Sequence, residues 1–217
     1  MNIALIGASG FVGSAILKEA ADRGHQVKAI VRNPEKVKQE SENVSITECD
    51  VMDTEKLVEV LKDSDAVISA YNPGWTNPDI YDDFLKGAQS IQEAVKKSAV
   101  KRLIVVGGAG SLYVAPGVQL IDTPEFPAEI KAGASAGRAY LEILKKEDQL
   151  DWTFLSPAIE MHPGTSGVRK GIYRAGLDNP VFDEHNRSVI SVEDTAVAVL
   201  DETEDPEHIG RRFTVAY

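Results

Sequence analysis

Two patterns of apolar residues alternate along the chain. Short runs of consecutive apolar residues are each followed by a longer segment whose apolar residues recur every three or four positions. Consecutive apolar residues are typical of strands buried on both faces, and the wider spacing is typical of helices that cover a sheet. The predicted strands are the run before Gly7, Gln26 to Val31, Val44 to Thr47, Asp65 to Ala70, the run in KRLIVVGG, and Trp152 to Leu155. The predicted helices are 11–23 with Gly24 as its stop, Thr54 to Lys62, Asp79 to Ser98, and Ala136 to Asp148.

This alternation predicts the fold class. Parallel strands joined by right-handed helical crossovers form a doubly wound, mostly parallel α/β sheet of the Rossmann type. The pattern changes at residues 159–192, which are rich in Gly and Pro, and we expect them to form a small C-terminal lobe that closes over a bound molecule. A last helix, opened by Ser191 or by Glu193 and Asp194, and a final strand, RRFTVAY, then return to the sheet. No linker divides the chain, so residues 1–217 are expected to form one domain.

Three glycines follow the first strand in GASGFVG, where a nucleotide-binding turn would lie. Gly7 permits a tight exit from the strand, Gly10 leaves room for a pyrophosphate, and Gly13 lets the helix pack closely on the sheet. Backbone N–H groups at the helix start, with the hydroxyl of Ser9, would face the phosphates. The alternative is that the glycines serve close packing without a ligand.

The residue that ends the second strand bears on the choice of cofactor. An NAD site usually has Asp or Glu there, about 20 residues beyond the glycines, whereas this chain has Arg32. A guanidinium binds a 2′-phosphate through forked hydrogen bonds, so NADP(H) is the preferred cofactor and NAD(H) the alternative. Arg32 could also be a solvated residue before a further helix, with Asn33 as its cap and Pro34 in its first turn.

Composition limits the classes of partner. The formal net charge is −11, and both nucleic acids and anionic membranes need clustered cationic charge, so neither is expected as a partner. The one cysteine, Cys49, fits an ordinary strand residue, and neither a signal peptide nor a membrane-length apolar run is evident, so we expect a reducing cytoplasm. The four histidines are scattered, which predicts no metal site. Both a monomer and a homodimer are compatible with the sequence.

The motifs as a set are similar to those of one superfamily. GASGFVG at the start, Asp50–Val51, VISA, SPA and ISVEDTAVAVLDE span nearly the whole chain, which resembles the atypical short-chain dehydrogenase/reductases. The VGGAGSL and YNPGW segments are most similar to a small bacterial group described as NADH-flavin reductases or NAD-dependent epimerase/dehydratase-like proteins. That group is related to biliverdin reductase B and NmrA-like proteins.

The resemblance implies a set of cofactor contacts. Gly7, Ser9, Gly10, Phe11, Val12 and Gly13 would hold the pyrophosphate, Arg32 the adenosine phosphate, and Asp50 and Val51 the adenine. Ala70 and Tyr71 would line the nicotinamide-ribose side, with Ser156, Pro157 and Ala158 near the nicotinamide ring. Asp50 could instead cap a helix, and Ser156-Pro157 could simply end a strand.

One departure from the superfamily concerns catalysis. Active members carry Tyr-x-x-x-Lys on the helix after the fifth strand, whereas here Tyr140 is followed four positions later by Leu144. Ser111 and Tyr113 lie close to the usual serine region and are the candidate catalytic residues. This departure argues against alcohol dehydrogenation and sugar epimerisation, which need a strong proton relay.

Hydride transfer to a planar acceptor needs less from the protein, because the cofactor carries the reaction. We therefore expect an NAD(P)H-dependent reductase of a flavin-like or quinone-like small molecule. Trp75 and Leu112, with Tyr71 and Tyr113, would form the platform for it, although these side chains could equally pack between loops. The alternatives are a nucleotide-sugar epimerase or dehydratase and a non-catalytic NADP(H)-sensing regulatory protein.

Overall fold

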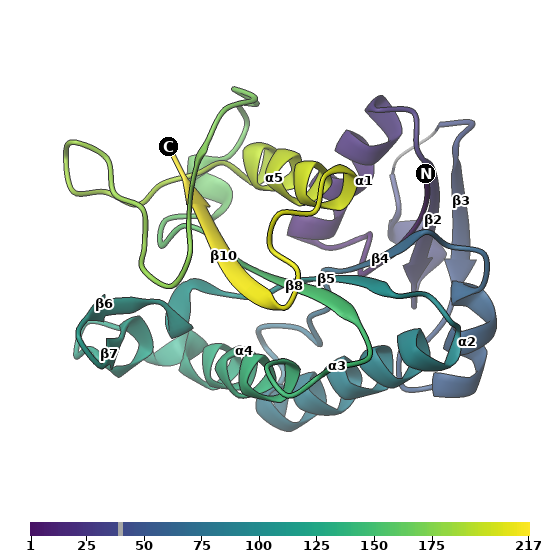
Figure 1. Cartoon of the computed structure of the whole chain (residues 1–217), viewed down its shortest axis with the longest axis horizontal. Coiled ribbons are helices and arrows are strands. Elements are labelled where there is room, and N and C mark those ends of the chain that lie inside the picture. The colour runs from purple at the N-terminus through teal and green to yellow at the C-terminus, as the bar shows by residue number, and fades with distance from the viewer. Residues whose placement is uncertain (39–40) are drawn as a thin grey trace.

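An eight-stranded sheet runs through the middle of the computed structural model, which describes residues 1–38 and 41–217 (Figure 1). The strand order is β3-β2-β1-β4-β5-β8-β10-β9, and every neighbouring pair is parallel except β9 with β10. The strands are β1 (Asn2–Ile6), β2 (Gln26–Val31), β3 (Val44–Glu48), β4 (Ala66–Ser69), β5 (Arg102–Val106), β8 (Asp151–Ser156), β9 (Arg174–Gly176) and β10 (Arg211–Ala216). The predicted doubly wound, mostly parallel Rossmann sheet is confirmed.

Helices cover both faces of this sheet (Figure 1). On one face lie α1 (Phe11–Asp22) and α5 (Val192–Glu204), and on the other lie α2 (Thr54–Leu61), α3 (Ile80–Lys97) and α4 (Lys131–Leu144). Strand β1 shows why the apolar runs are continuous. Ile3 and Leu5 belong to the core beneath α1 and α5, whereas Ala4 and Ile6 belong to the core beneath α2, α3 and α4. A strand buried on both faces needs apolar residues at every position.

Most helix ends follow the sequence signals. Helix α1 ends at Asp22, and Gly24 then adopts the left-handed conformation at φ +81°, as expected for a helix stop. The Ser191 hydroxyl caps α5 by accepting the Asp194 N–H at 3.0 Å. The cap of α2 is Asp53, which accepts the Lys56 N–H at 3.1 Å, rather than Asp50.

Two predicted helices differ from the structure. Helix α4 begins at Lys131 rather than Ala136 and ends at Leu144. Its first turns carry small residues, so the apolar periodicity that marks a helix becomes visible only from Ala136 onward. The helix expected after Arg32 is a single 3-10 turn, Pro34–Lys36; Asn33 makes no side-chain cap bond there, and the backbone is extended at Val37.

The segment after β8 is tied to the sheet rather than separate from it. It contains the 3-10 turn Pro163–Thr165 and β9, which pairs with β10. The Tyr113 N–H, in the short hairpin of β6 (Tyr113–Ala115) and β7 (Val118–Gln119), donates to the Asp178 carbonyl at 2.8 Å. Three further 3-10 turns, Ala109–Ser111, Leu120–Asp122 and Ala128–Ile130, connect β5 to α4.

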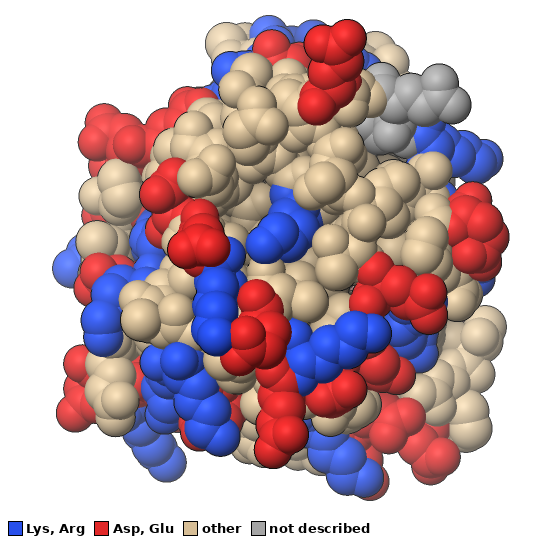
Figure 2. All heavy atoms as spheres, turned by 90° about the vertical axis from the view of Figure 1, so that its right-hand side faces the viewer, with Lys and Arg blue, Asp and Glu red and all other residues tan. Residues whose placement is uncertain are grey.

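The surface carries both signs of charge. On the face that includes β2, β3 and α2, acidic and basic side chains are interspersed (Figure 2). Within the described residues no helix combines the length and apolar character that crossing a bilayer requires. The same residues contain no group of three or more His, Cys, Asp or Glu side chains arranged to hold a metal ion.

Candidate functional site

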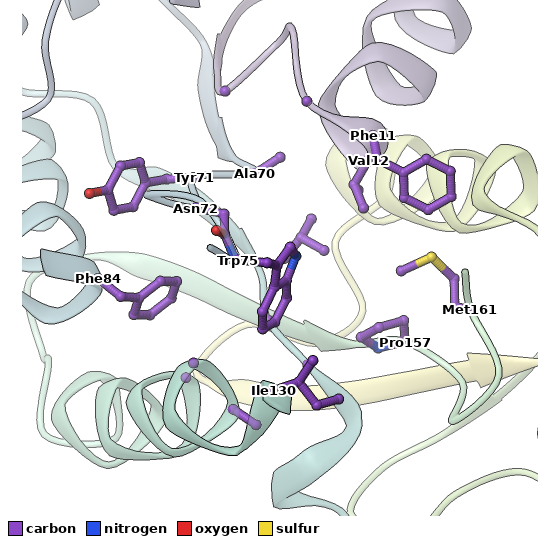
Figure 3. A pocket seen from close by; sticks show the side chains of 18 of the residues that line it. Phe11, Val12, Ala70, Tyr71, Asn72, Trp75, Phe84, Ile130, Pro157 and Met161 are labelled. Carbon is purple, nitrogen blue, oxygen red and sulfur yellow. The ribbon is translucent and has the colours of Figure 1, made fainter. Parts of the chain in front are cut away.

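A cavity of about 880 Å³ lies at the carboxyl ends of the central strands (Figure 3). Its walls include the residues that end or follow five strands, which are Gly7 after β1, Arg32 after β2, Ala70 after β4, Gly107 after β5 and Pro157 after β8. Ligands of doubly wound sheets bind at this edge. The cavity is therefore the candidate site.

The turn between β1 and α1 depends on two glycines. Gly7 has φ +80°, and a Cβ there would lie 2.6 Å from the Ala70 carbonyl oxygen. A Cβ on Gly13 would lie 2.0 Å from the Gly7 carbonyl oxygen, so Gly13 lets α1 approach the strand. Gly13 does not line the cavity, which makes its role here one of packing.

The start of α1 faces the cavity, and no acidic side chain of its first turn offsets the positive end of the helix dipole. Ser9, Gly10, Phe11 and Val12 line the cavity. Gly10, at the N-cap position, offers no side-chain hydrogen bond, and the first turn holds no acidic residue. The backbone N–H groups of this turn and the positive end of the helix dipole therefore fit an anionic group.

Two cations line the cavity beyond β2. Arg32 directly follows the strand and is exposed, and Lys36 lies in the 3-10 turn after it. The sequence did not identify Lys36 as a site residue. The 3-10 turn that begins at Pro34 brings Lys36 to the same side of the cavity as Arg32. Val51 also lines this end, with the buried Cys49, whose thiol pKa is raised by burial.

Asp50 does not line the cavity. It is exposed, and its carboxylate accepts the Met52 N–H at 3.0 Å in the turn that precedes α2. The carboxylate therefore lies beside the cavity wall formed by Cys49 and Val51, and its contact with the adenine stays a prediction.

Ala70 and Tyr71 form the wall after β4 (Figure 3). The Tyr71 hydroxyl donates to the Asp83 carbonyl at 3.1 Å, and its ring stacks on Phe84 with the centroids 6.0 Å apart. Burial raises the pKa of Tyr71 to about 12. Tyr71 is therefore a fixed wall of the cavity rather than a group that exchanges protons near neutral pH.

The half of the cavity beyond β5 and β8 is mostly apolar. It is lined by Trp75, the glycine-rich segment after β5, Pro157 and Ala158, and by residues between the hairpin and α4 that include Phe126 and Ile130. In Figure 3 the Trp75 indole projects between the β4 side and Ile130. Phe126 and Ile130 were missed from the sequence, because the irregular segment that holds Phe126 and the short 3-10 turn that ends at Ile130 have no periodic apolar pattern.

The expected catalytic residues lie outside the cavity. Ser111 is buried, and both its carbonyl and its hydroxyl oxygen accept from Arg212, at 2.8 and 3.0 Å. The Tyr113 ring faces the Arg212 guanidinium at 6.0 Å, and Leu112 is fully buried. These positions correct the expectation that Ser111 and Tyr113 reach an acceptor and that Leu112 forms part of its platform.

Ser156 also differs from its expected position. It is buried in β8 and does not line the cavity, whereas Pro157 and Ala158, the next two residues, do. Contact with a nicotinamide ring is therefore available to Pro157 and Ala158 but not to the Ser156 side chain.

The face of α4 that meets the cavity has no proton-transferring group. Ile130, just before the helix, and Gly133, Ala134 and Gly137 line the cavity at the spacing of one helical face. Tyr140 points into the core instead, edge-on to Phe84 at 6.3 Å, and burial raises its pKa. The positions at which a Tyr-x-x-x-Lys pair would face the cavity are thus Gly133 and Gly137.

The strand order, the glycine turn and the cavity at the carboxyl edge define a nucleotide-binding protein of the Rossmann class. The chain belongs to the NAD(P)H-binding family, whose model matches residues 7–205. The resemblance to the atypical short-chain dehydrogenase/reductases is confirmed, so a nicotinamide cofactor and an oxidoreductase-like fold are established at the level of the family.

Individual relatives cover the whole chain. The uncharacterized Bacillus subtilis protein YwnB is 44% identical over 217 residues, which is 99% of this chain and 98% of that one. A Bacteroides thetaiotaomicron protein provisionally described as an epimerase is 49% identical with a TM-score of 0.91, covering 100% of this chain and 96% of that one. A Streptococcus pneumoniae protein provisionally described as an NADH-flavin reductase is 36% identical with a TM-score of 0.86, covering 100% and 99%.

We predict that Gly13→Ala destabilises the protein by roughly 1–3 kcal/mol or more, because the added methyl group meets backbone that cannot move aside. Urea unfolding of both proteins measures the difference. A variant as stable as the wild type would show that the turn can relax and that the close approach is not required.

We also predict that Gly10→Val abolishes binding of NADPH and NADH. Its stability should fall by only about 1 kcal/mol, the typical cost of a poor N-cap residue, since a Cβ there meets only the Gly7 carbonyl oxygen, at 3.3 Å. Titration of nicotinamide fluorescence and a thermal melt test the two parts. A folded variant with wild-type affinity would mean that no phosphate passes over Gly10.

Proposed function

We propose that this protein is an NADPH-dependent reductase that transfers hydride to a planar, flavin-like or quinone-like acceptor. The observation that carries the proposal is the division of one continuous cavity. One half joins the open start of α1 to the cations Arg32 and Lys36, and the other is mostly apolar and bordered by a helix face without a proton relay.

The cofactor half offers a contact for each part of a dinucleotide. The open start of α1 would hold the pyrophosphate, and Arg32, assisted by Lys36, would hold the 2′-phosphate. Val51 would support the adenine, and Ala70 and Tyr71 the ribose of the nicotinamide. Pro157 and Ala158 would lie against the nicotinamide ring.

The chemistry requires little of the side chains. Reduction of a quinone or flavin takes one hydride and one proton; a bound dihydronicotinamide would supply the hydride, and solvent would supply the proton. Trp75, Phe126 and Ile130 would orient the acceptor and exclude water from its face. The rigid wall at Tyr71 would limit how far the acceptor ring extends over the nicotinamide ring.

The sequence is compatible with two other functions. Epimerisation or dehydration of a nucleotide sugar needs proton transfer at carbon or oxygen, and the α4 face that borders the cavity supplies no group for it. A redox-sensing protein would bind NADP(H) without turnover. Steady-state NADPH oxidation with a panel of quinones and flavins separates it from a reductase, since a sensor would bind tightly and show no turnover with any acceptor.

We predict that wild-type protein binds NADPH more tightly than NADH and that Arg32→Ala removes most of this preference. Losing a charge-assisted hydrogen bond to phosphate costs roughly 1.5–3 kcal/mol, or about ten- to a hundredfold in affinity. Titrations of both proteins with both cofactors measure it, and Lys36→Ala tests the second cation in the same way. Equal affinities for the two cofactors in the wild type would refute the assignment.

We further predict that Ser111→Ala and Tyr113→Phe each lower kcat less than about tenfold, whereas loss of a true general acid costs about a hundred- to ten-thousandfold. Trp75→Ala should act mainly through KM, because it removes binding area rather than chemistry. Measuring kcat and KM with NADPH and riboflavin decides the point. A collapse of kcat in Ser111→Ala or Tyr113→Phe would show that one of them moves into the cavity during turnover.

A further inference from the structure

We call the apolar half of the cavity the acceptor chamber. It is lined by Trp75, Gly108, Phe126, Ile130, Gly133 and Gly137. Its interpretation rests on the proposed reductase function. The chamber has two properties that bear on the chemical class of the acceptor, namely the space above α4 and the charge of its walls.

Gly137 has no packing reason to be glycine. It lies in the interior of α4, where glycine is less favourable than alanine. A Cβ on it would meet nothing within 4 Å, although the residue is buried and lines the cavity. Gly108, which also lines the cavity, likewise has open space where its Cβ would be.

Gly133 differs from Gly137 in this respect. A Cβ there would lie 2.8 Å from the Trp75 ring and 2.9 Å from Ile80, so Gly133 is required to seat the indole against the helix. Gly137, one helical turn further on, lies on the same face and leaves the adjoining surface of α4 bare. The result is open space over the α4 backbone on the helix face that also carries an aromatic ring, and this space can admit a planar molecule that stacks on the ring.

The charge of the chamber is opposite to that of the cofactor half. Among the described residues that line the cavity, Arg32 and Lys36 lie beyond β2, and His162 follows Met161, which Figure 3 shows between Phe11 and Pro157. Glu125, next to Phe126, is the charged residue on the chamber side. A phosphate group on an acceptor that lies beside Phe126 would therefore meet a carboxylate there.

We propose that the acceptor chamber selects uncharged planar ring systems, such as quinones or riboflavin, over their phosphorylated forms, with Gly137 and Glu125 as the residues that set this specificity. Gly137 provides the space for the ring. Glu125 disfavours acceptors that carry a phosphate group.

The space is tested by Gly137→Leu, with Ala132→Leu as the matched control at an exposed, non-lining position of the same helix. We expect Gly137→Leu to weaken riboflavin binding to the NADP+ complex at least tenfold, measured by quenching of flavin fluorescence, and to leave the affinity for NADPH unchanged. Gly137→Ala should bind riboflavin more weakly than the wild type and melt about 2 °C higher, since alanine favours the helix.

The charge is tested with riboflavin and FMN, which share one ring system and differ by a phosphate. We expect wild-type protein to bind riboflavin about fivefold more tightly than FMN, and Glu125→Gln to reduce this ratio while leaving riboflavin affinity unchanged. Glu129→Gln, an exposed neighbour that does not line the cavity, should leave the ratio as it is.

The outcomes separate this proposal from the reductase function. If Gly137→Leu weakens NADPH binding as much as flavin binding, the space belongs to the cofactor and the chamber assignment is wrong, although reductase activity can stand. Equal or tighter binding of FMN by the wild type would overturn the charge selection. Binding of riboflavin as expected, without NADPH oxidation by any acceptor, would refute the reductase and leave the chamber as a binding site.

Discussion

The close approach of backbone to backbone at Gly7 and Gly13 is the constraint on which the site depends. Because Gly13 has no side chain, α1 begins directly beneath the end of β1, and its first N–H groups open into the cavity. Because Gly7 has none either, its Cα can come close to the Ala70 carbonyl, which places the segment after β4 beside the turn. Ala70, Tyr71 and the loop to Trp75 start from that contact, so one turn positions walls of both halves of the cavity.

Much of the fold was predictable because burial on both faces leaves a plain record in the sequence. Each inner strand of the parallel sheet must be apolar at nearly every position, and each covering helix shows its own spacing. The glycine turn and Arg32 were also predictable, since their places follow from the strands that precede them. The start of α4 was not, because the face it turns to the cavity consists of small residues that give no apolar signal.

The errors at the site come from contacts between distant parts of the chain. The place of Ser111 after β5 predicts that it reaches the cavity, but Arg212 of β10 donates to both of its oxygens. Phe126 and Ile130 enter the cavity through irregular turns that only the assembled fold brings to it. Local patterns record which residues are buried, but not which distant side chain each buried residue contacts.

Strand β9 has a consequence for how the molecule behaves among its copies. It is only three residues long and runs antiparallel to β10, so it covers the end of a sheet whose last long strand contains the buried residues Phe213 and Val215. A long, flat, apolar edge invites another chain to add a strand, and a short edge offers few unpaired backbone groups for this. The segment that borders the cavity therefore also supplies, through β9, a short strand that disfavours edge-to-edge aggregation at this edge of the sheet.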